Sequence, residues 1–305
     1  MRQHLEGLIA APLTPMHADG SVNLAVIEQQ AEFLHRNGVK GAFLCGTTGE
    51  GMSLTTSERM EIARRWVEAA ADDFTVIVHV GHTSLEVCKS LAVHARQIGA
   101  WGMGAMAPCF FKPRSVEDLV DFCEKIAAAA PELPFYYYHI PSMTGVNFPM
   151  VEFLAAAADR MPNLAGVKYT WEDLMDFELC RKLDGGRFDM LFGRDELLLC
   201  GLALGARGAV GSTHNIAAPL YIRLIEAFLA GDLETARSLQ RKSMEMIQLL
   251  NRYGDPNFVA TKAVMKMLGL DCGPVRPPLR NLTTSQYEGL QAGLRQMGFF
   301  EFCCK

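Results

Sequence analysis

The residue types best suited to chemistry in this sequence are a lysine and a tyrosine on two neighbouring apolar segments. Lys168 lies in the apolar stretch 164–170, which is typical of a short buried β-strand. A buried ammonium must be paired, must reach water along its stem, or must have its pKa lowered by desolvation. In the last case the amine is a nucleophile that forms a Schiff base with a ketone. Tyr138 lies near the end of the preceding apolar stretch, 134–141, and the pair has the parts for imine-forming aldolase chemistry.

Short apolar segments that alternate with longer amphipathic segments must position these two residues. Near-continuous apolarity indicates strands buried on both faces, and hence a parallel sheet. The expected strands cover residues 7–14, 41–46, 75–81, 102–108, 135–140, 165–170, 188–193 and 208–213. Helices are expected between them, among others over residues 24–37, 56–71, 85–98, 116–130 and 150–160.

About eight strand–helix units in the first part of the chain predict an α/β fold of the (β/α)8 TIM barrel type. A doubly wound sheet is the alternative, but it should carry a glycine-rich nucleotide turn after its first strand, and residues 14–20 offer none. After the eighth unit the strand signals stop, and helices are expected over residues 217–229, 233–250, 256–268 and 284–297. We therefore expect a TIM barrel catalytic domain over residues 1–220 and a C-terminal helical extension over residues 221–305.

Reactive side chains of a TIM barrel sit at the C-terminal ends of the strands and in the loops that follow them. Side-chain alternation places Lys168 and Thr170 on one strand face. The positions at the strand ends that carry polar groups or glycine are Thr47, Thr48, Tyr138, Lys168, Thr170, Gly193, Asp195, Glu196, Ser212 and Thr213.

Two of these loops have compositions that point to particular ligands. The loop 45–51 is rich in hydroxyls and exposed backbone N–H groups, which suits it to hold a carboxylate through neutral donors. Asp195 and Glu196 follow the seventh strand, where many barrels bind phosphate. Acidic groups there disfavour a phosphorylated substrate and favour a polyol. The same two residues could instead be the first turn of a helix, stabilised by its dipole.

Composition and charge exclude several other classes of function. The 305 residues carry a formal charge of -5 with a pI near 5.9, which gives no sign of a nucleic-acid partner. No apolar run is long enough to span a bilayer, and the first residues lack the apolar core of a secretory signal. The nine cysteines are scattered and form no Cys-x-x-Cys pair, so we expect reduced thiols and a cytoplasmic location. The histidines lack zinc-type spacing, and no metal site is expected.

Four motifs together carry a resemblance to a known family: residues 46–50, 138–145, 166–170 and 193–196. On these motifs the chain resembles the class I pyruvate aldolases, which include N-acetylneuraminate lyase and dihydrodipicolinate synthase. The resemblance runs from about residue 8 through the C-terminal helices. It implies a homotetramer in which Lys168 is the Schiff-base lysine and Tyr138 the phenol that assists proton transfer. Thr47 and Thr48 would hold the pyruvate carboxylate, and no cofactor would be needed because the imine is the electron sink.

Departures from the synthase pattern indicate the branch of the family. The synthases usually have an arginine where this chain has Met143, and a tyrosine where it has Phe110 and Phe111. Segments 136–141, 193–196 and 211–215 are instead similar to the sialic acid lyases. That likeness implies cleavage of N-acetylneuraminate to N-acetylmannosamine and pyruvate, with the sugar and its tail contacted by Thr170, Gly193, Asp195, Glu196 and Ser212.

The sequence also fits other functions. A different pyruvate-dependent aldolase, acting on a 2-keto-3-deoxy sugar acid, or an enzyme similar to dihydrodipicolinate synthase would keep the Lys168–Tyr138 core. A non-catalytic sensor of a keto acid is the alternative outside enzymes, although the intact lysine, tyrosine and threonines argue against it.

Overall fold

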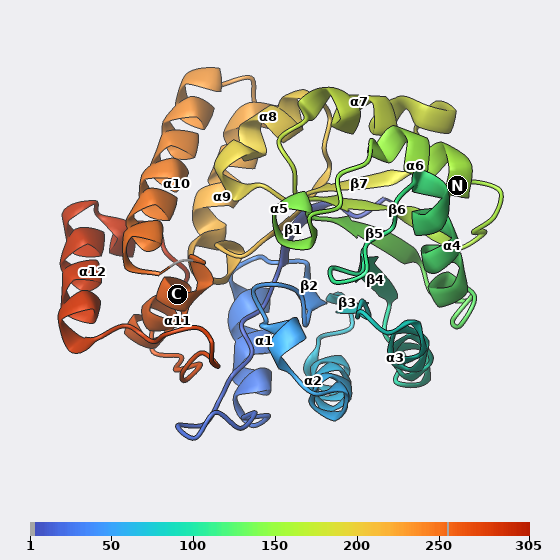
Figure 1. Cartoon of the computed structure of the whole chain (residues 1–305). Helices are drawn as coiled ribbons and strands as arrows, with labels where there is room; N and C mark the ends of the chain where they lie inside the picture. The colour runs from blue at the N-terminus through green and yellow to red at the C-terminus, as the bar shows by residue number, and fades with distance from the viewer. Residues whose placement is uncertain (1–3, 255) are drawn as a thin grey trace.

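Eight parallel strands close into a barrel in chain order, which confirms the predicted (β/α)8 fold. The computed structural model describes residues 4–254 and 256–305. Strand β1 pairs with β2 on one side and with β8 on the other, so the sheet has no free edge (Figure 1). The strands are β1 Gly7–Ala10, β2 Gly41–Leu44, β3 Thr75–His79, β4 Gly102–Met106, β5 Phe135–His139, β6 Leu164–Tyr169, β7 Asp189–Phe192 and β8 Gly208–Gly211.

Most strands end earlier than the apolar segments that predict them. The first apolar segment continues to residue 14, but β1 ends at Ala10, and the following Ala11 and Leu13 are buried in a loop. Strand β2 ends at Leu44 because Cys45 takes a left-handed conformation (φ 53°) that leaves the extended region. Buried loops at the carboxyl ends of the strands therefore share the apolarity of the strands themselves.

Helices surround the barrel and cover its strands. They are α1 Val26–Arg36, α2 Thr56–Ala69, α3 Leu85–Gln97, α4 Val116–Ala127, α5 Pro141–Thr144, α6 Met150–Ala157, α7 Leu174–Lys182 and α8 Leu198–Ala203. Helix α2 begins with a capping box in which Thr55 and Glu58 satisfy each other's backbone N–H groups. Short 3-10 turns lie at η1 Gly51–Ser53, η2 Leu183–Gly186, η3 Asp195–Leu197 and η4 Phe299–Glu301.

Four helices follow the eighth strand, as expected: α9 His214–Leu229, α10 Leu233–Tyr253, α11 Phe258–Met267 and α12 Thr284–Gln296. Helices α10, α11 and α12 lie together on one side of the barrel (Figure 1), and α10 packs against α9. The expected boundary at residue 220 falls inside α9, so this helix belongs to both parts, and the division into two domains stays a prediction. No helix of residues 4–254 and 256–305 is long and apolar enough to cross a membrane.

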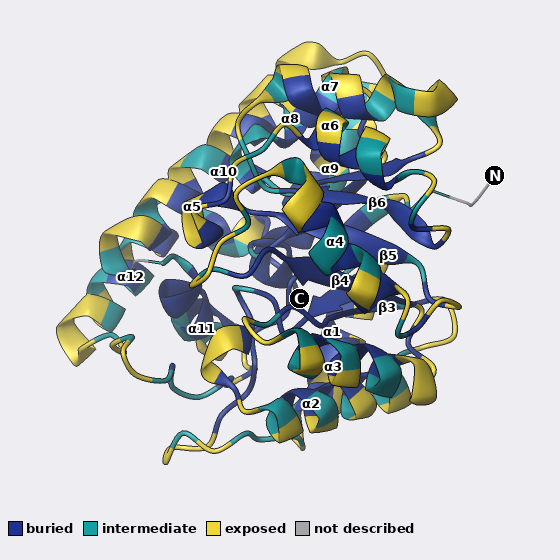
Figure 2. Cartoon of the chain, turned by 45° about the vertical axis from the view of Figure 1, so that its right-hand side comes forward, coloured by how far each residue is buried: buried dark blue, intermediate teal, exposed yellow. Residues whose placement is uncertain are grey.

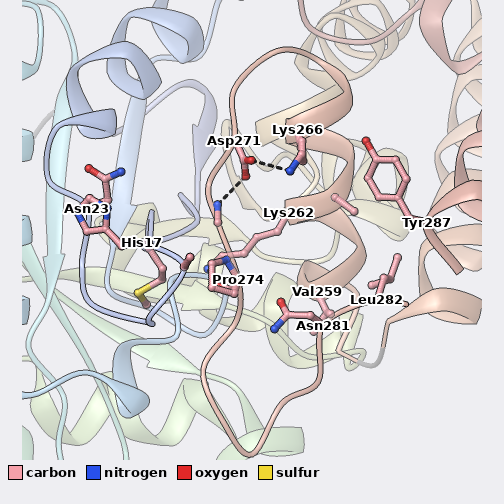
Figure 3. A pocket seen from close by; sticks show the side chains of 14 residues that line it. His17, Asn23, Val259, Lys262, Lys266, Asp271, Pro274, Asn281, Leu282 and Tyr287 are labelled. Carbon is pink, nitrogen blue, oxygen red and sulfur yellow. Dashed lines mark hydrogen bonds and ion pairs between the residues drawn. The ribbon is translucent and has the colours of Figure 1, made fainter. Parts of the chain in front are cut away.

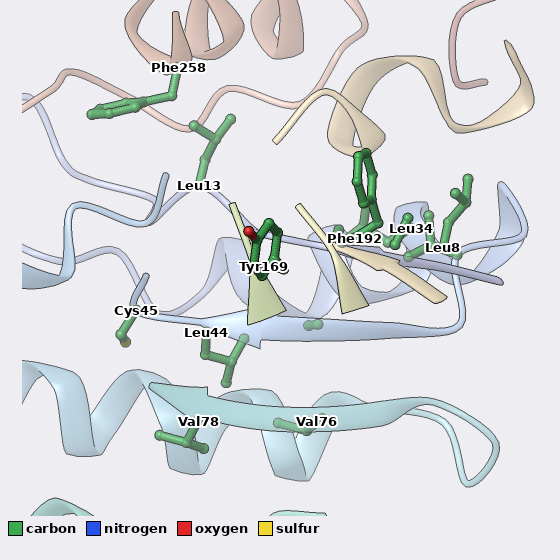
Figure 4. Packing of buried hydrophobic residues seen from close by; sticks show 14 of the residues in the cluster. Leu8, Leu13, Leu34, Leu44, Cys45, Val76, Val78, Tyr169, Phe192 and Phe258 are labelled. Atoms are coloured by element: carbon green, nitrogen blue, oxygen red, sulfur yellow. The ribbon is translucent and has the colours of Figure 1, made fainter. Parts of the chain in front are cut away.

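The core has two layers, one outside the strands and one inside the barrel. Outward side chains such as Leu8, Val78 and Phe192 pack against the helices (Figure 4). Figure 2 shows buried strands and helices with an exposed outer face. The inner layer is a separate cluster made of Ile9, Phe43, Ile77, Met106, Tyr136, Tyr138, Ile140, Ala165, Leu191 and Val210. The chemistry predicted from the sequence would therefore take place in the inner layer, beside Tyr138.

Candidate active site

Lys168 and Tyr138 are paired across adjacent strands at the inner surface of the barrel. Their Cα atoms are register partners in the β5–β6 ladder. Lys168 Nζ lies 3.9 Å from the centre of the Tyr138 ring and 4.1 Å from the centre of the Phe43 ring. Two rings from different strands thus enclose the amine.

The surroundings of Lys168 favour the neutral amine. The residue is only 3% exposed, so its side chain does not reach bulk water. Burial lowers the pKa of Lys168 to about 7, and the negative charge of Asp195 opposes the shift. Near neutral pH a large fraction of the amine is therefore unprotonated, which is the form that attacks a carbonyl carbon.

The Tyr138 hydroxyl is a proton donor held near the loop between β2 and α2. It lies 3.3 Å from Thr47 Oγ1. Burial raises the pKa of Tyr138 to about 12, although the neighbouring hydroxyls of Thr47 and Thr170 lower it. The phenol is therefore protonated at neutral pH and is placed to give or relay a proton beside the amine.

The Thr47–Thr48 segment belongs to a tight loop whose backbone tolerates few other residues. Glu50 N donates to Thr47 O over 3.0 Å, and Gly51 N donates to Gly46 O over 3.0 Å. A Cβ atom on Gly51 would lie 1.8 Å from Cys45 O, so a side chain there is excluded. Thr48 is buried and Thr47 is half-buried. The loop therefore holds two hydroxyls in fixed positions next to the barrel interior.

Thr170 and Gly193 meet where β6 and β7 end. Gly193 N donates to Tyr169 O over 2.8 Å and continues the ladder by one residue. A Cβ atom at Gly193 would lie 2.2 Å from Thr170 Oγ1. Glycine at this position therefore leaves room for the threonine hydroxyl beside the site.

The turn that follows β8 holds the side chain of Asp195 in place. Its Oδ2 accepts hydrogen bonds from Thr213 N (2.9 Å) and Thr213 Oγ1 (2.5 Å). The chain of hydroxyls continues from Thr213 to Tyr221 (2.6 Å) on α9 and to Ser243 (2.8 Å) on α10. A Cβ atom at Gly211 would lie 2.0 Å from Asp195 Oδ1, so a larger residue there would displace the carboxylate. The extension thereby fixes a charge that acts on Lys168.

Glu196 and Ser212 lie at the same end of the barrel but are bound less tightly. Glu196 forms an ion pair with Arg194 over 3.1 Å, and burial raises the pKa of its carboxyl group. Ser212 is half-buried directly after β8. Asp195 and Glu196 also open the 3-10 turn η3, which agrees with the alternative expectation that they form the first turn of a helical segment. Neither Glu196 nor Ser212 bonds to Lys168 or Tyr138 in the described part of the chain.

Two further aromatic residues, Phe43 and His79, lie beside Tyr138 and are not among the site residues predicted from the sequence. Phe43 packs edge-on against Tyr138 with ring centres 5.4 Å apart. The ring of His79 lies 5.9 Å from that of Tyr138, and burial lowers the pKa of His79 well below its usual value. Side chains alternate between the two faces of a strand. Strand periodicity could therefore have placed Phe43 on the inner face of the barrel, the face that also holds Ile77 on β3. Within residues 4–254 and 256–305, no cluster of three or more histidine, cysteine or acidic side chains could hold a metal ion.

Comparison with known proteins identifies the family of the chain. The model of the dihydrodipicolinate synthetase family matches residues 4–297, and the chain belongs to that family. An N-acetylneuraminate lyase from Rattus norvegicus is 41% identical over 305 residues, which cover 99% of this chain and 95% of the relative. The structure of Proteus mirabilis N-acetylneuraminate lyase superposes with a TM-score of 0.94 at 43% identity, covering 97% of this chain and 100% of that one. A Ruminococcus gnavus sialic acid aldolase, solved as a catalytic lysine mutant, has a TM-score of 0.92 at 26% identity, covering 97% of each chain.

Proposed function

We propose that the protein is an N-acetylneuraminate lyase, a carbon–carbon lyase of the class I aldolase type. It cleaves N-acetylneuraminate reversibly to N-acetylmannosamine and pyruvate. The observation that carries the proposal is the desolvated amine of Lys168, which lies over the ring of Tyr138 inside a closed barrel. The relatives named above supply the choice of substrate, because a Schiff-base lysine alone fits many keto acids.

Lys168 is the nucleophile in the proposed reaction. Its neutral amine adds to the C2 ketone of the open-chain sugar, and loss of water gives an iminium ion. The C3–C4 bond then breaks, its electrons move to the iminium nitrogen to give an enamine, and the C4 hydroxyl loses its proton as C4 becomes an aldehyde. Tyr138 relays this proton. Protonation of the enamine at C3 and hydrolysis of the imine release pyruvate and free the lysine. No metal or organic cofactor takes part.

The remaining candidates divide between the two halves of the substrate. Thr47 and Thr48 hold the pyruvate carboxylate through hydroxyl and backbone N–H groups. The sugar and its hydroxylated tail are bound by Thr170, Gly193, Asp195, Glu196 and Ser212. Asp195 Oδ2 accepts from Thr213, and its Oδ1 lies 3.7 Å from His214 Nε2, so the turn after β8 contacts both oxygens of this carboxylate.

Residues at the barrel mouth support the lyase over the synthase branch. Met143 on α5 is 55% exposed and offers no cation for a second substrate carboxylate.

We also propose that the protein is a cytoplasmic homotetramer. Phe110 and Phe111 are 77% and 86% exposed, and such an apolar pair suits burial between subunits. Light scattering coupled to size-exclusion chromatography measures the subunit count.

The substrate is tested by measuring pyruvate release from N-acetylneuraminate and from a panel of 2-keto-3-deoxy sugar acids. The lyase proposal expects the highest kcat/KM for N-acetylneuraminate. A higher kcat/KM for a panel member would assign the enzyme to another pyruvate-dependent aldolase. Condensation of pyruvate with aspartate semialdehyde, assayed in parallel, tests for synthase activity.

A further inference from the structure

A buried ion pair joins the Thr47–Thr48 loop to the C-terminal helices. Glu50 Oε1 lies 2.7 Å from Lys262 Nζ on α11, and the two side chains are 0% and 4% exposed. Glu50 Oε2 accepts a hydrogen bond from Arg276 N over 2.8 Å. Lys262 Nζ also donates to Pro274 O over 2.6 Å. The carboxylate is therefore held on both oxygens by residues of the extension.

The backbone of Glu50 is part of the same turn as the threonines. Glu50 has a left-handed conformation (φ 54°), which is unfavourable for a residue other than glycine. Its N–H closes the turn onto Thr47 O, and its own carbonyl accepts from Ser53 N over 2.8 Å. A displacement of the Glu50 side chain therefore has a direct path to the position of Thr47.

The ion pair is better suited to fix a position than to add stability. Desolvating two charges offsets most of their attraction, so buried ion pairs contribute little net stability. Their geometric demand is high, however, because a buried charge without its partner is strongly unfavourable. Arg276 extends the same connection, since its side chain donates to Gly20 O (2.9 Å), to Ser53 O (3.0 Å) and to Glu58 on α2 (2.8 Å).

Lys262 also lines a cleft beside helix α11 (Figure 3). The cleft has a volume of about 540 Å³ and lies between the β1–α1 loop and the extension, with Met16, His17 and Tyr287 among its lining residues. One helical turn beyond Lys262, Lys266 forms an exposed ion pair with Asp271 over 2.9 Å in the same cleft. The two lysines thus share a helix and a cleft, but only Lys262 reaches the loop.

We propose that Glu50 and Lys262 are positioning residues that hold Thr47 and Thr48 in place for the substrate carboxylate. The inference rests on the proposed function, because it assigns the loop to the carboxylate of a keto acid. It extends that function by giving the C-terminal helices a direct part in substrate binding.

The test measures pyruvate binding through the adduct that it forms at Lys168. Wild type, Glu50→Gln and Lys262→Met are reduced with borohydride over a range of pyruvate concentrations, and the modified fraction is read by intact mass. Loss of the ion pair should raise the half-saturating pyruvate concentration about tenfold or more, the effect of losing about one charge-assisted hydrogen bond. The fraction labelled at saturation should stay close to that of wild type.

Two controls separate positioning from general damage. Lys266→Met makes the same chemical change one turn along α11 and should leave half-saturation unchanged. Hydroxyacetone forms an imine but has no carboxylate, so its half-saturation should be the same in all variants. A rise for both pyruvate and hydroxyacetone, or a fall only in the fraction labelled at saturation, would assign the pair a purely structural role and overturn the inference.

The double variant Glu50→Gln/Lys262→Met removes both buried charges and covers the case in which a single variant does not fold. If the two residues act through one contact, its half-saturation matches that of a single variant, whereas independent effects would multiply. A multiplied effect, or a double variant with wild-type half-saturation, overturns the inference. Absence of any adduct in wild type would instead overturn the proposed function on which the inference rests.

Discussion

Lys168 and Tyr138 are direct neighbours across the β5–β6 ladder, and the lysine Nζ lies 3.9 Å from the centre of the tyrosine ring. The ladder fixes the two backbones side by side through hydrogen bonds, so neither residue depends on a flexible loop for its place. The amine and the phenol therefore lie side by side inside the barrel, each on its own strand.

Replacement of the lysine should abolish the covalent step. Lys168→Met keeps an apolar chain between the rings of Phe43 and Tyr138 and removes the nucleophile. Borohydride reduction with pyruvate should then add no pyruvyl mass, whereas wild type should gain one such mass, localised to Lys168 by peptide mapping. An adduct on another lysine in wild type would show that the nucleophile has been misassigned.

Loss of the tyrosine hydroxyl should slow turnover without preventing imine formation. Tyr138→Phe keeps the ring contacts with Phe43 and Lys168 and removes the 3.3 Å contact with Thr47. We expect kcat to fall about 10²–10⁴-fold, the range for loss of a general acid–base group. The borohydride adduct should still form. A kcat within about twofold of wild type would remove Tyr138 from the proton relay.

The rate of imine formation should rise with pH through neutrality. The pKa of Lys168 is lowered to about 7, so protonation removes the nucleophile below that pH. Asp195 raises this pKa, and Asp195→Asn should therefore move the acid limb of the profile to lower pH. The initial rate of borohydride trapping with pyruvate measures the limb without involving the sugar. An unshifted limb in Asp195→Asn would show that this carboxylate does not act on the amine.

The reactive amine should also reduce the stability of the fold. Because the pKa of Lys168 is lower in the folded chain than its ordinary value of 10.5, protonation favours the unfolded state. The resulting destabilisation is fully present below about pH 7 and disappears as the pH rises towards the unfolded value. Lys168→Met should thus unfold at a higher temperature than wild type at pH 6, by about a few kcal/mol in free energy. The gain should shrink by pH 9. A variant less stable than wild type at pH 6 would contradict the lowered pKa.

The barrel and its reactive pair could be predicted from sequence because both depend on local pattern. Apolar runs mark the strands, and Lys168 and Tyr138 are polar exceptions near the strand ends. The support of Asp195 by Tyr221 and Ser243 could not be predicted in this way. Those residues lie on helices, where a hydroxyl gives no local sign of the direction it faces. The ends of the strands were also misplaced, since the buried loop after Ala10 is as apolar as the strand.

The contact between Glu50 and Lys262 was missed for a similar reason. Its two residues come from distant parts of the chain, and a Thr-Thr-Gly-Glu turn with a lysine on an amphipathic helix gives no pairing signal. Only the packing of α11 beside the barrel brings them together. The roles proposed for the site residues remain predictions, because neither the fold nor the relatives test them individually.

The anchoring of Asp195 by Tyr221 and Ser243 has a consequence for protein engineering. Exchange of barrel-mouth loops between family members is a natural route to new substrate preferences. In this chain the acidic loop after β7 has its partners on α9 and α10, in a part of the gene that a loop graft leaves behind. A chimera that transfers the loop together with both helices should preserve the donor's selectivity, whereas the loop alone would arrive without its supports.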